Sequence, residues 1–131
     1  MRLLLDTHVW VWSLLEPARP SQRVRTALED GGSQFWVSPV SVWELVILTA
    51  KGRLTLLPDV ERWVERAMDE TPIQEAAVTN AVAIETRRLK LPHSDPADHF
   101  IAATARVFEL TLVAADQRLL RAGTVRTMKA N

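Results

Sequence analysis

Two aspartates each come at the end of a short apolar run that is typical of a buried β-strand. Asp6 ends the predicted strand 3–6, and Asp116 follows the predicted strand 111–115. In an open parallel sheet, ligands bind in a crevice at the carboxyl ends of the strands, so both carboxylates should point toward one crevice. Either aspartate alone could instead cap the helix that follows its strand. The presence of both favours a shared site.

A third acid, Glu44, lies within a predicted helix. The residues four before, three after and four after it are Val40, Ile47 and Leu48, so its carboxylate shares the apolar face of that helix. A carboxylate in such a position needs a partner. The alternative is a capping box, in which Ser41 and Glu44 satisfy each other's backbone amides at the start of a helix.

The fourth acid, Asp98, lies in the first turn of another predicted helix. Apolar residues follow it at three, four and seven positions, which places Asp98 at one end of the buried face. Asp95 and Pro96 fit the N-cap and the first helical position, and an acid near the positive end of a helix is favourable. We therefore interpret Asp95 as the cap and Asp98 as a ligand.

Four carboxylates that converge on one crevice repel one another unless a cation lies between them. Their hard oxygen atoms select magnesium, manganese or calcium over zinc. The chain has no cysteine that could bind zinc as a thiolate or act as a nucleophile. Magnesium held by carboxylates orients water and stabilises charge in phosphodiester hydrolysis. The acids therefore predict a nuclease that uses Mg²⁺, with Mn²⁺ as the second candidate ion.

The elements that position these acids alternate between β-rich apolar runs and helical stretches, which is typical of an α/β domain with a mainly parallel sheet. Strands are predicted at residues 3–6, 34–38, 71–74, 111–115 and 125–128. Helices are predicted at residues 7–15, 21–29, 39–51, 59–70, 75–89, 96–109 and 117–121.

Length and composition predict a single domain over residues 1–131, because a chain of this size can bury one core. We expect a cytoplasmic protein without a membrane segment, since Asp6 interrupts the N-terminal apolar run and the sequence has no apolar stretch that could span a bilayer. Sixteen basic and sixteen acidic residues give zero formal net charge, which neither favours nor excludes RNA. Arg87, Arg88 and Lys90 could contact phosphates, although a solvated helix end is the simpler explanation.

The segments that carry the acids resemble PIN domains, specifically VapC-type toxins of bacterial toxin–antitoxin pairs. The similar segments are 3–10 (LLLDTHVW), 38–45 (SPVSVWEL), 95–105 (DPADHFIAATA) and 112–116 (LVAAD). The resemblance covers nearly the whole chain. It implies a PIN-like three-layer sandwich, in which a mainly parallel sheet lies between layers of helices.

The resemblance also implies roles for particular residues. It makes Asp6, Glu44, Asp98 and Asp116 the metal-binding and catalytic acids. Thr7 and Asp95 become candidates for holding these ligands by hydrogen bonds. Many relatives carry arginine after the third acid, where this sequence has His99. This departure leaves a phosphate contact at that position open.

The implied reaction is endonucleolytic cleavage of RNA by a metal-activated water that attacks phosphorus and leaves a 5′-phosphate and a 3′-hydroxyl. The resemblance further implies a homodimer and an antitoxin protein whose tail covers the cleft. Trp10 and Trp12 on the first helix are one candidate landing site for the antitoxin, although tryptophans are more often core residues. The alternative function is a non-catalytic magnesium-binding module, either a degenerate PIN domain or a receiver-like domain.

Overall fold

The computed structural model describes residues 1–91 and 95–131. At its centre lies a five-stranded sheet in the order β3-β2-β1-β4-β5, in which every neighbouring pair is parallel. The strands are β1 (Arg2–Leu5), β2 (Gln34–Val37), β3 (Ile73–Glu75), β4 (Thr111–Ala114) and β5 (Thr127–Lys129). Because β1 is the central strand, the residue that follows it lies in the middle of the carboxyl end of the sheet.

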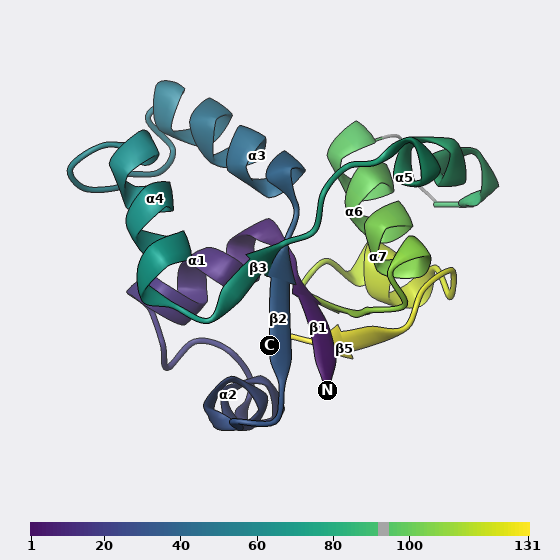
Figure 1. Cartoon of the computed structure of the whole chain (residues 1–131), viewed down its shortest axis with the longest axis horizontal. Helices are drawn as coiled ribbons and strands as arrows, with labels where there is room; N and C mark the ends of the chain where they lie inside the picture. Colours follow the sequence, from purple (N-terminus) through teal and green to yellow (C-terminus); the bar gives the residue numbers. More distant parts are fainter. Residues whose placement is uncertain (92–94) are drawn as a thin grey trace.

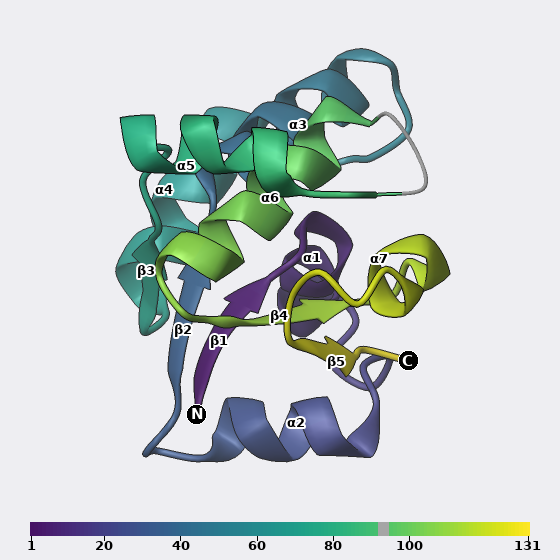
Figure 2. The same cartoon turned by 90° about the vertical axis from the view of Figure 1, so that its right-hand side faces the viewer.

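Helices cover both faces of this sheet. Figure 1 shows α1, α2 and α4 on one side of the strands and α6 and α7 on the other. In Figure 2, β1 runs from the N-terminus toward the end of the molecule where α3 and α5 lie. The helices are α1 (Thr7–Leu15), α2 (Gln22–Glu29), α3 (Pro39–Ala50), α4 (Val60–Glu70), α5 (Asn80–Glu85), α6 (Pro96–Val107) and α7 (Gln117–Arg121). This arrangement confirms the predicted three-layer sandwich.

The uninterrupted leucine run of β1 supplies both layers of the core. Leu3 and Leu5 pack in one cluster of buried residues, whereas Leu4 packs in another together with Ile101 of α6 and Leu112 of β4. Successive side chains of a strand point to opposite faces of its sheet, and here both faces are covered. Packing of these leucines on both faces of the sheet therefore fixes the position of the carboxyl end of β1.

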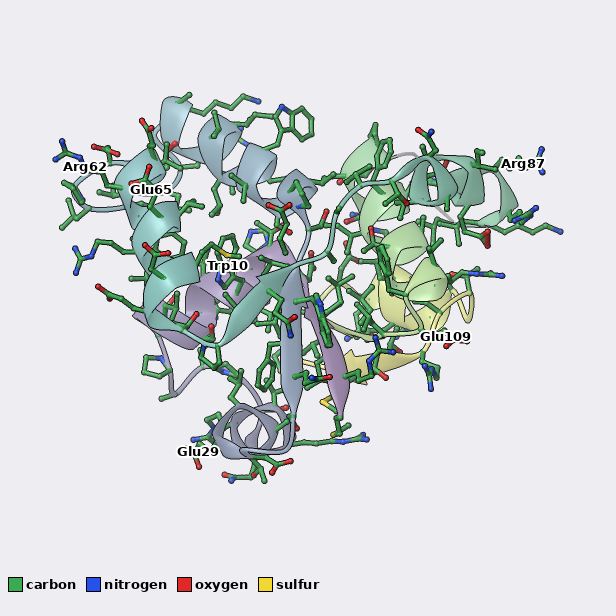
Figure 3. All side chains as sticks on the ribbon, in the orientation of Figure 1. Trp10, Glu29, Arg62, Glu65, Arg87 and Glu109 are labelled. Carbon is green, nitrogen blue, oxygen red and sulfur yellow. The ribbon has the colours of Figure 1, made fainter. Side chains whose placement is uncertain are left out.

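Two tryptophans of α1 belong to the core, which is the alternative that the sequence left open beside a contact with the antitoxin. Trp10 and Trp12 are only 1% and 8% exposed. The ring of Trp10 packs edge-on against Trp63 of α4 at 5.4 Å, and the guanidinium of Arg19 lies 4.1 Å from the ring of Trp12. Figure 3 shows Trp10 inside the molecule, whereas the other labelled residues, which are charged, lie at its edge.

Most predicted elements agree with the structure to within two residues, but the predicted helix 75–89 does not. Glu75 belongs to β3, and α5 begins only at Asn80 and gives way to a 3₁₀ turn (Thr86–Arg88). Pairing of β3 with β2 extends the chain at Glu75, and the Thr79 hydroxyl caps α5 by accepting a hydrogen bond from Val82 N at 3.2 Å. None of the helices in the described part of the chain is long and apolar enough to cross a membrane.

Candidate active site

Asp6 lies at the junction of β1 and α1, with no loop between the two elements. Its backbone N–H donates to Val113 O at 3.0 Å, which continues the sheet by one residue, and its side chain is 8% exposed. Oδ1 of Asp6 accepts a hydrogen bond from Thr7 N at 2.8 Å, so Asp6 is the N-cap of α1. Capping uses one of the two carboxylate oxygens and does not prevent the carboxylate from binding a cation.

Glu44 reaches from α3 to the first residue of α1. The Thr7 hydroxyl donates a hydrogen bond to Glu44 Oε1 and lies 2.8 Å from the Ser41 hydroxyl. The N-cap of α3 is Ser38, whose Oγ accepts from Val40 N at 3.0 Å, so Ser41 and Glu44 do not form a capping box. Ser41 is buried beside Thr7, and sequence reasoning missed this contact although Ser41 lies one helical turn before Glu44.

Asp95 and Asp98 occupy the start of α6 in the way that the sequence predicts. Oδ1 of Asp95 accepts from Ala97 N at 3.0 Å, which makes Asp95 the N-cap. Asp98 lies in the first turn and is 8% exposed. The ring Nδ1 of His99 lies 2.9 Å from the backbone oxygen of Asp95. The positive end of α6 stabilises the negative charge of Asp98.

Asp116 follows β4 and is the N-cap of α7. Its Oδ1 accepts from Arg118 N at 2.8 Å. The guanidinium of Arg118 also binds both carboxylate oxygens, with Nη2 at 3.0 Å from Oδ2 and Nε at 3.3 Å from Oδ1. Sequence reasoning missed Arg118, since a spacing of two residues does not by itself direct a guanidinium back to the cap.

The four predicted ligands lie close enough at the carboxyl end of the sheet for the charges of the other three to act on Asp6. Burial is the largest of the effects that raise the pKa of Asp6 to about 7, and the hydrogen bond from Thr7 N opposes it. The negative charges of Asp98, Glu44 and Asp116 raise the pKa of Asp6 further. Burial also raises the pKa of Glu44.

The chemistry of these groups suits a hard divalent cation. All four are carboxylates, whose oxygens Mg²⁺ and Mn²⁺ prefer. As the side chains stand, no three acids or histidines of the described residues converge closely enough to hold one ion. Asp6, Glu44 and Asp116 instead hydrogen-bond to neighbouring groups of the protein. Asp6, Glu44, Asp98 and Asp116 are the residues that would hold such an ion, whose positive charge would offset the negative charges that add to the effect of burial on the pKa of Asp6.

Comparison with known proteins identifies the family. The model of the PIN domain matches residues 3–125. The chain is also 33% identical over 120 residues to Ribonuclease VapC22 of Mycobacterium tuberculosis (strain ATCC 25618 / H37Rv), a match that covers 89% of this chain and 88% of that protein. The chain therefore belongs to the PIN domain family, and within it to the VapC type.

Solved structures share the fold at lower sequence identity. VapBC2 from Rickettsia felis, bound to a DNA fragment from its promoter, matches all of this chain and all of its own, with a TM-score of 0.73 and 16% identity. A toxin–antitoxin complex from Klebsiella pneumoniae matches 94% of each chain, with a TM-score of 0.60 and 19% identity. These matches confirm the PIN-like fold.

The raised pKa of Asp6 predicts how the stability of the metal-free protein depends on pH. The folded protein binds this proton up to about pH 7, whereas the ordinary pKa is 3.8. Between these values the folded state holds more protons than the unfolded state, so the free energy of unfolding falls as pH rises. Asp6→Asn keeps the helix cap and removes the titrating group. Thermal melts in EDTA should therefore show that this variant loses less stability than the wild type between about pH 5 and about pH 8.

The exposed acid Asp69 on α4 provides the matched control. Asp69→Asn should retain the pH dependence of the wild type. If Asp6→Asn and the wild type lose stability equally over this range, Asp6 is not the buried acid that the site requires.

Proposed function

We propose that this protein is a divalent-metal-dependent endoribonuclease that acts as the toxin of a toxin–antitoxin pair in the cytoplasm. One observation carries the proposal: Asp6 is buried at the carboxyl end of the sheet, and burial together with the negative charges of Asp98, Glu44 and Asp116 raises its pKa. These acids belong to a chain that is 33% identical to a protein named as a ribonuclease. A cluster of this kind is costly without a cation, so its presence favours a catalytic metal site.

In this proposal Asp6, Glu44, Asp98 and Asp116 hold Mg²⁺ or Mn²⁺. The bound ion supplies a Lewis acid and an activated water for hydrolysis of the RNA phosphodiester. The residues around the acids fix their orientation. The Thr7 hydroxyl, itself in contact with the Ser41 hydroxyl, holds Glu44 against α1, and Arg118 holds Asp116 at the end of β4.

The first test of this mechanism is RNA cleavage with and without metal. EDTA should abolish cleavage, and excess Mg²⁺ should restore it, because the site has only carboxylates to organise the reaction. Asp98→Asn should lower the cleavage rate by at least about 100-fold, the order of the contribution made by a single electrostatic group in an active site. Asp95→Asn should retain most of the rate, since asparagine caps a helix about as well as aspartate.

Undiminished cleavage in EDTA, with contaminating nucleases excluded, would refute the mechanism. An equal loss of cleavage in Asp98→Asn and Asp95→Asn would show that Asp95 is wrongly assigned as the cap and Asp98 as the ligand. Binding of Mg²⁺ without RNA cleavage would favour the alternative, a non-catalytic magnesium-binding module.

A groove at the end of α1 is a better candidate for the antitoxin than the buried Trp10 and Trp12. The groove has a volume of about 360 Å³ and lies between α1, the loop before α4 and α4 itself. Its wall includes Leu57, Leu15 and Leu14, which are 74%, 48% and 37% exposed. Exposed leucines around a groove are typical of a site that receives apolar side chains of a partner. We therefore place the antitoxin contact here, next to the helix that the sequence indicated.

Expression without the antitoxin should arrest growth, and Asp98→Asn should relieve the arrest. Leu57→Glu should leave the arrest in place but prevent its relief by the cognate antitoxin, since an apolar partner would have to remove the new charge from water. Pull-down of the antitoxin checks the loss of binding directly. Thr26→Glu on α2, outside the groove, should be neutralised as the wild type is. Full neutralisation of Leu57→Glu would contradict the placement of the contact.

The outer face of α3 is the surface we assign to a homodimer. This helix carries a single charged residue, Glu44, yet along its described length only Ser41 and Leu45 are buried. Trp43 and Val46, one turn apart on the same face, are 55% and 45% exposed. A helix that is apolar on nearly all sides is normally covered. In a twofold dimer the same surface of each protomer contacts its copy on the other protomer. A surface without charged residues avoids repulsion between like charges in such a contact.

Val46→Glu should shift the protein from dimer to monomer, because it places two like charges at the twofold interface. Light scattering after size-exclusion chromatography measures the mass. Thr26→Glu, on a helix at the far end of the molecule from α3, is the control that should stay dimeric (Figure 2). A dimer that survives Val46→Glu unchanged would place the interface elsewhere.

A further inference from the structure

A pocket next to the fourth acid is lined by basic side chains. Its volume is about 480 Å³. One wall is Lys90 and Leu91, which follow the 3₁₀ turn after α5. The other wall consists of α7 and the residue after it, through Gln117, Arg118, Arg121 and Ala122. Among the residues that the structure describes, three cations line this pocket and no acid does.

The basic residues of the pocket differ from other basic residues in the same part of the molecule. Arg88 and Arg106 both pair with Glu85, at 2.8 Å and 3.2 Å. Lys90 and Arg121, in contrast, have no acidic side chain of the described residues within 4.0 Å. No acid of the described residues within that distance balances their two positive charges, and both line the same pocket. An anion bound between them would be attracted by both charges.

Arg118 connects this pocket to the acids of the candidate active site. Its guanidinium lines the pocket and also binds both oxygens of Asp116. The hydrogen bond to Asp116 and the negative charge of nearby Asp98 both raise the pKa of Arg118, so it stays charged. A group bound in the pocket is thus separated from the fourth acid by one side chain.

Positive charge beside the acids would help the substrate of the proposed function to bind. RNA is a polyanion, and the four carboxylates repel the phosphates that approach them. The chain has zero formal net charge, so no general positive field compensates. Local cations beside the acids can do so, and guanidinium groups suit phosphate because they donate two parallel hydrogen bonds.

We propose that the pocket binds a phosphate of the RNA strand next to the phosphate that is cleaved. Lys90 and Arg121 contact this phosphate, and Arg118 separates it from Asp116. The inference rests on the proposed ribonuclease function and adds a substrate-binding site to it. Of the residues that sequence reasoning grouped as Arg87, Arg88 and Lys90, it assigns only Lys90 to the substrate.

The test measures RNA binding separately from cleavage. In an Asp98→Asn background, which should not cut RNA, the affinity for a single-stranded RNA oligonucleotide is measured over a range of salt concentrations. Lys90→Gln and Arg121→Gln should each weaken binding roughly tenfold, as expected for one charge-assisted hydrogen bond. Each should also reduce the slope of log affinity against log salt by about 0.7, the value for one phosphate contact on a single strand.

Arg87→Gln is the matched control, because Arg87 lies three residues from Lys90 but outside the pocket and points away from the molecule (Figure 3). It should change neither affinity nor salt slope. In the nuclease with Asp98 restored, the two pocket variants should raise KM and leave kcat close to that of the wild type. Neither pocket residue is buried, so the variants should fold, and thermal melts check this.

The inference is overturned if the pocket variants bind RNA as Arg87→Gln does, while the wild type still cleaves RNA with Mg²⁺. In that case the ribonuclease function stands without this site. Weaker binding of the antitoxin with unchanged binding of RNA would also overturn it, because the pocket would then receive an acidic segment of a protein. A wild type that cleaves no RNA in any divalent metal would refute the proposed function, and this inference would fall with it.

Discussion

The repulsion among carboxylates at the carboxyl end of the sheet is the constraint on which the rest of the molecule depends. Burial is the largest of the effects that raise the pKa of Asp6 to about 7, and the negative charges of three other acids add to it. A carboxylate in this state weakens the folded protein at neutral pH, so the fold must hold these groups against their own charge. The Thr7 hydroxyl holds Glu44, the guanidinium of Arg118 holds Asp116, and the start of α6 faces Asp98 with its positive end.

Hydrophobic packing supplies the rigidity that this arrangement needs. β1 is the central strand, and its leucines alternate between two buried layers, so its end cannot move toward either face. Helix α1 begins one residue after Asp6, which leaves no loop to relax the repulsion. The contact between Trp10 and Trp63 then fixes α1 to α4. The position of one carboxylate is thereby tied to the packing of both helical layers.

The formal net charge of this protein is zero, but acidic and basic side chains occupy separate places on it. Acids gather at one end of the sheet, and the cations of the basic pocket lie directly beside them, with Arg118 in contact with Asp116. A uniform basic surface would attract any polyanion, whereas a small basic pocket next to an acidic site attracts one that enters in a particular orientation. Apolar side chains are exposed at the groove beside Leu57 and on the outer face of α3.

The sequence alone determined the class of fold and the four segments that carry acids, because strand runs, helix periods and caps are local patterns. It also identified Asp95 as the cap of α6, since Pro96 marks the start of a helix. The sequence could not determine which elements pack against the apolar side of each helix. Periodicity placed Trp10 on an apolar side of α1, but only the packing of α4 decided that this side is core. The sequence allowed Ser41 and Glu44 to form a capping box, whereas in the tertiary structure Ser38 caps α3 and Glu44 accepts a hydrogen bond from the Thr7 hydroxyl. Contacts between residues distant in sequence depend on how elements meet in space, and no local pattern encodes them.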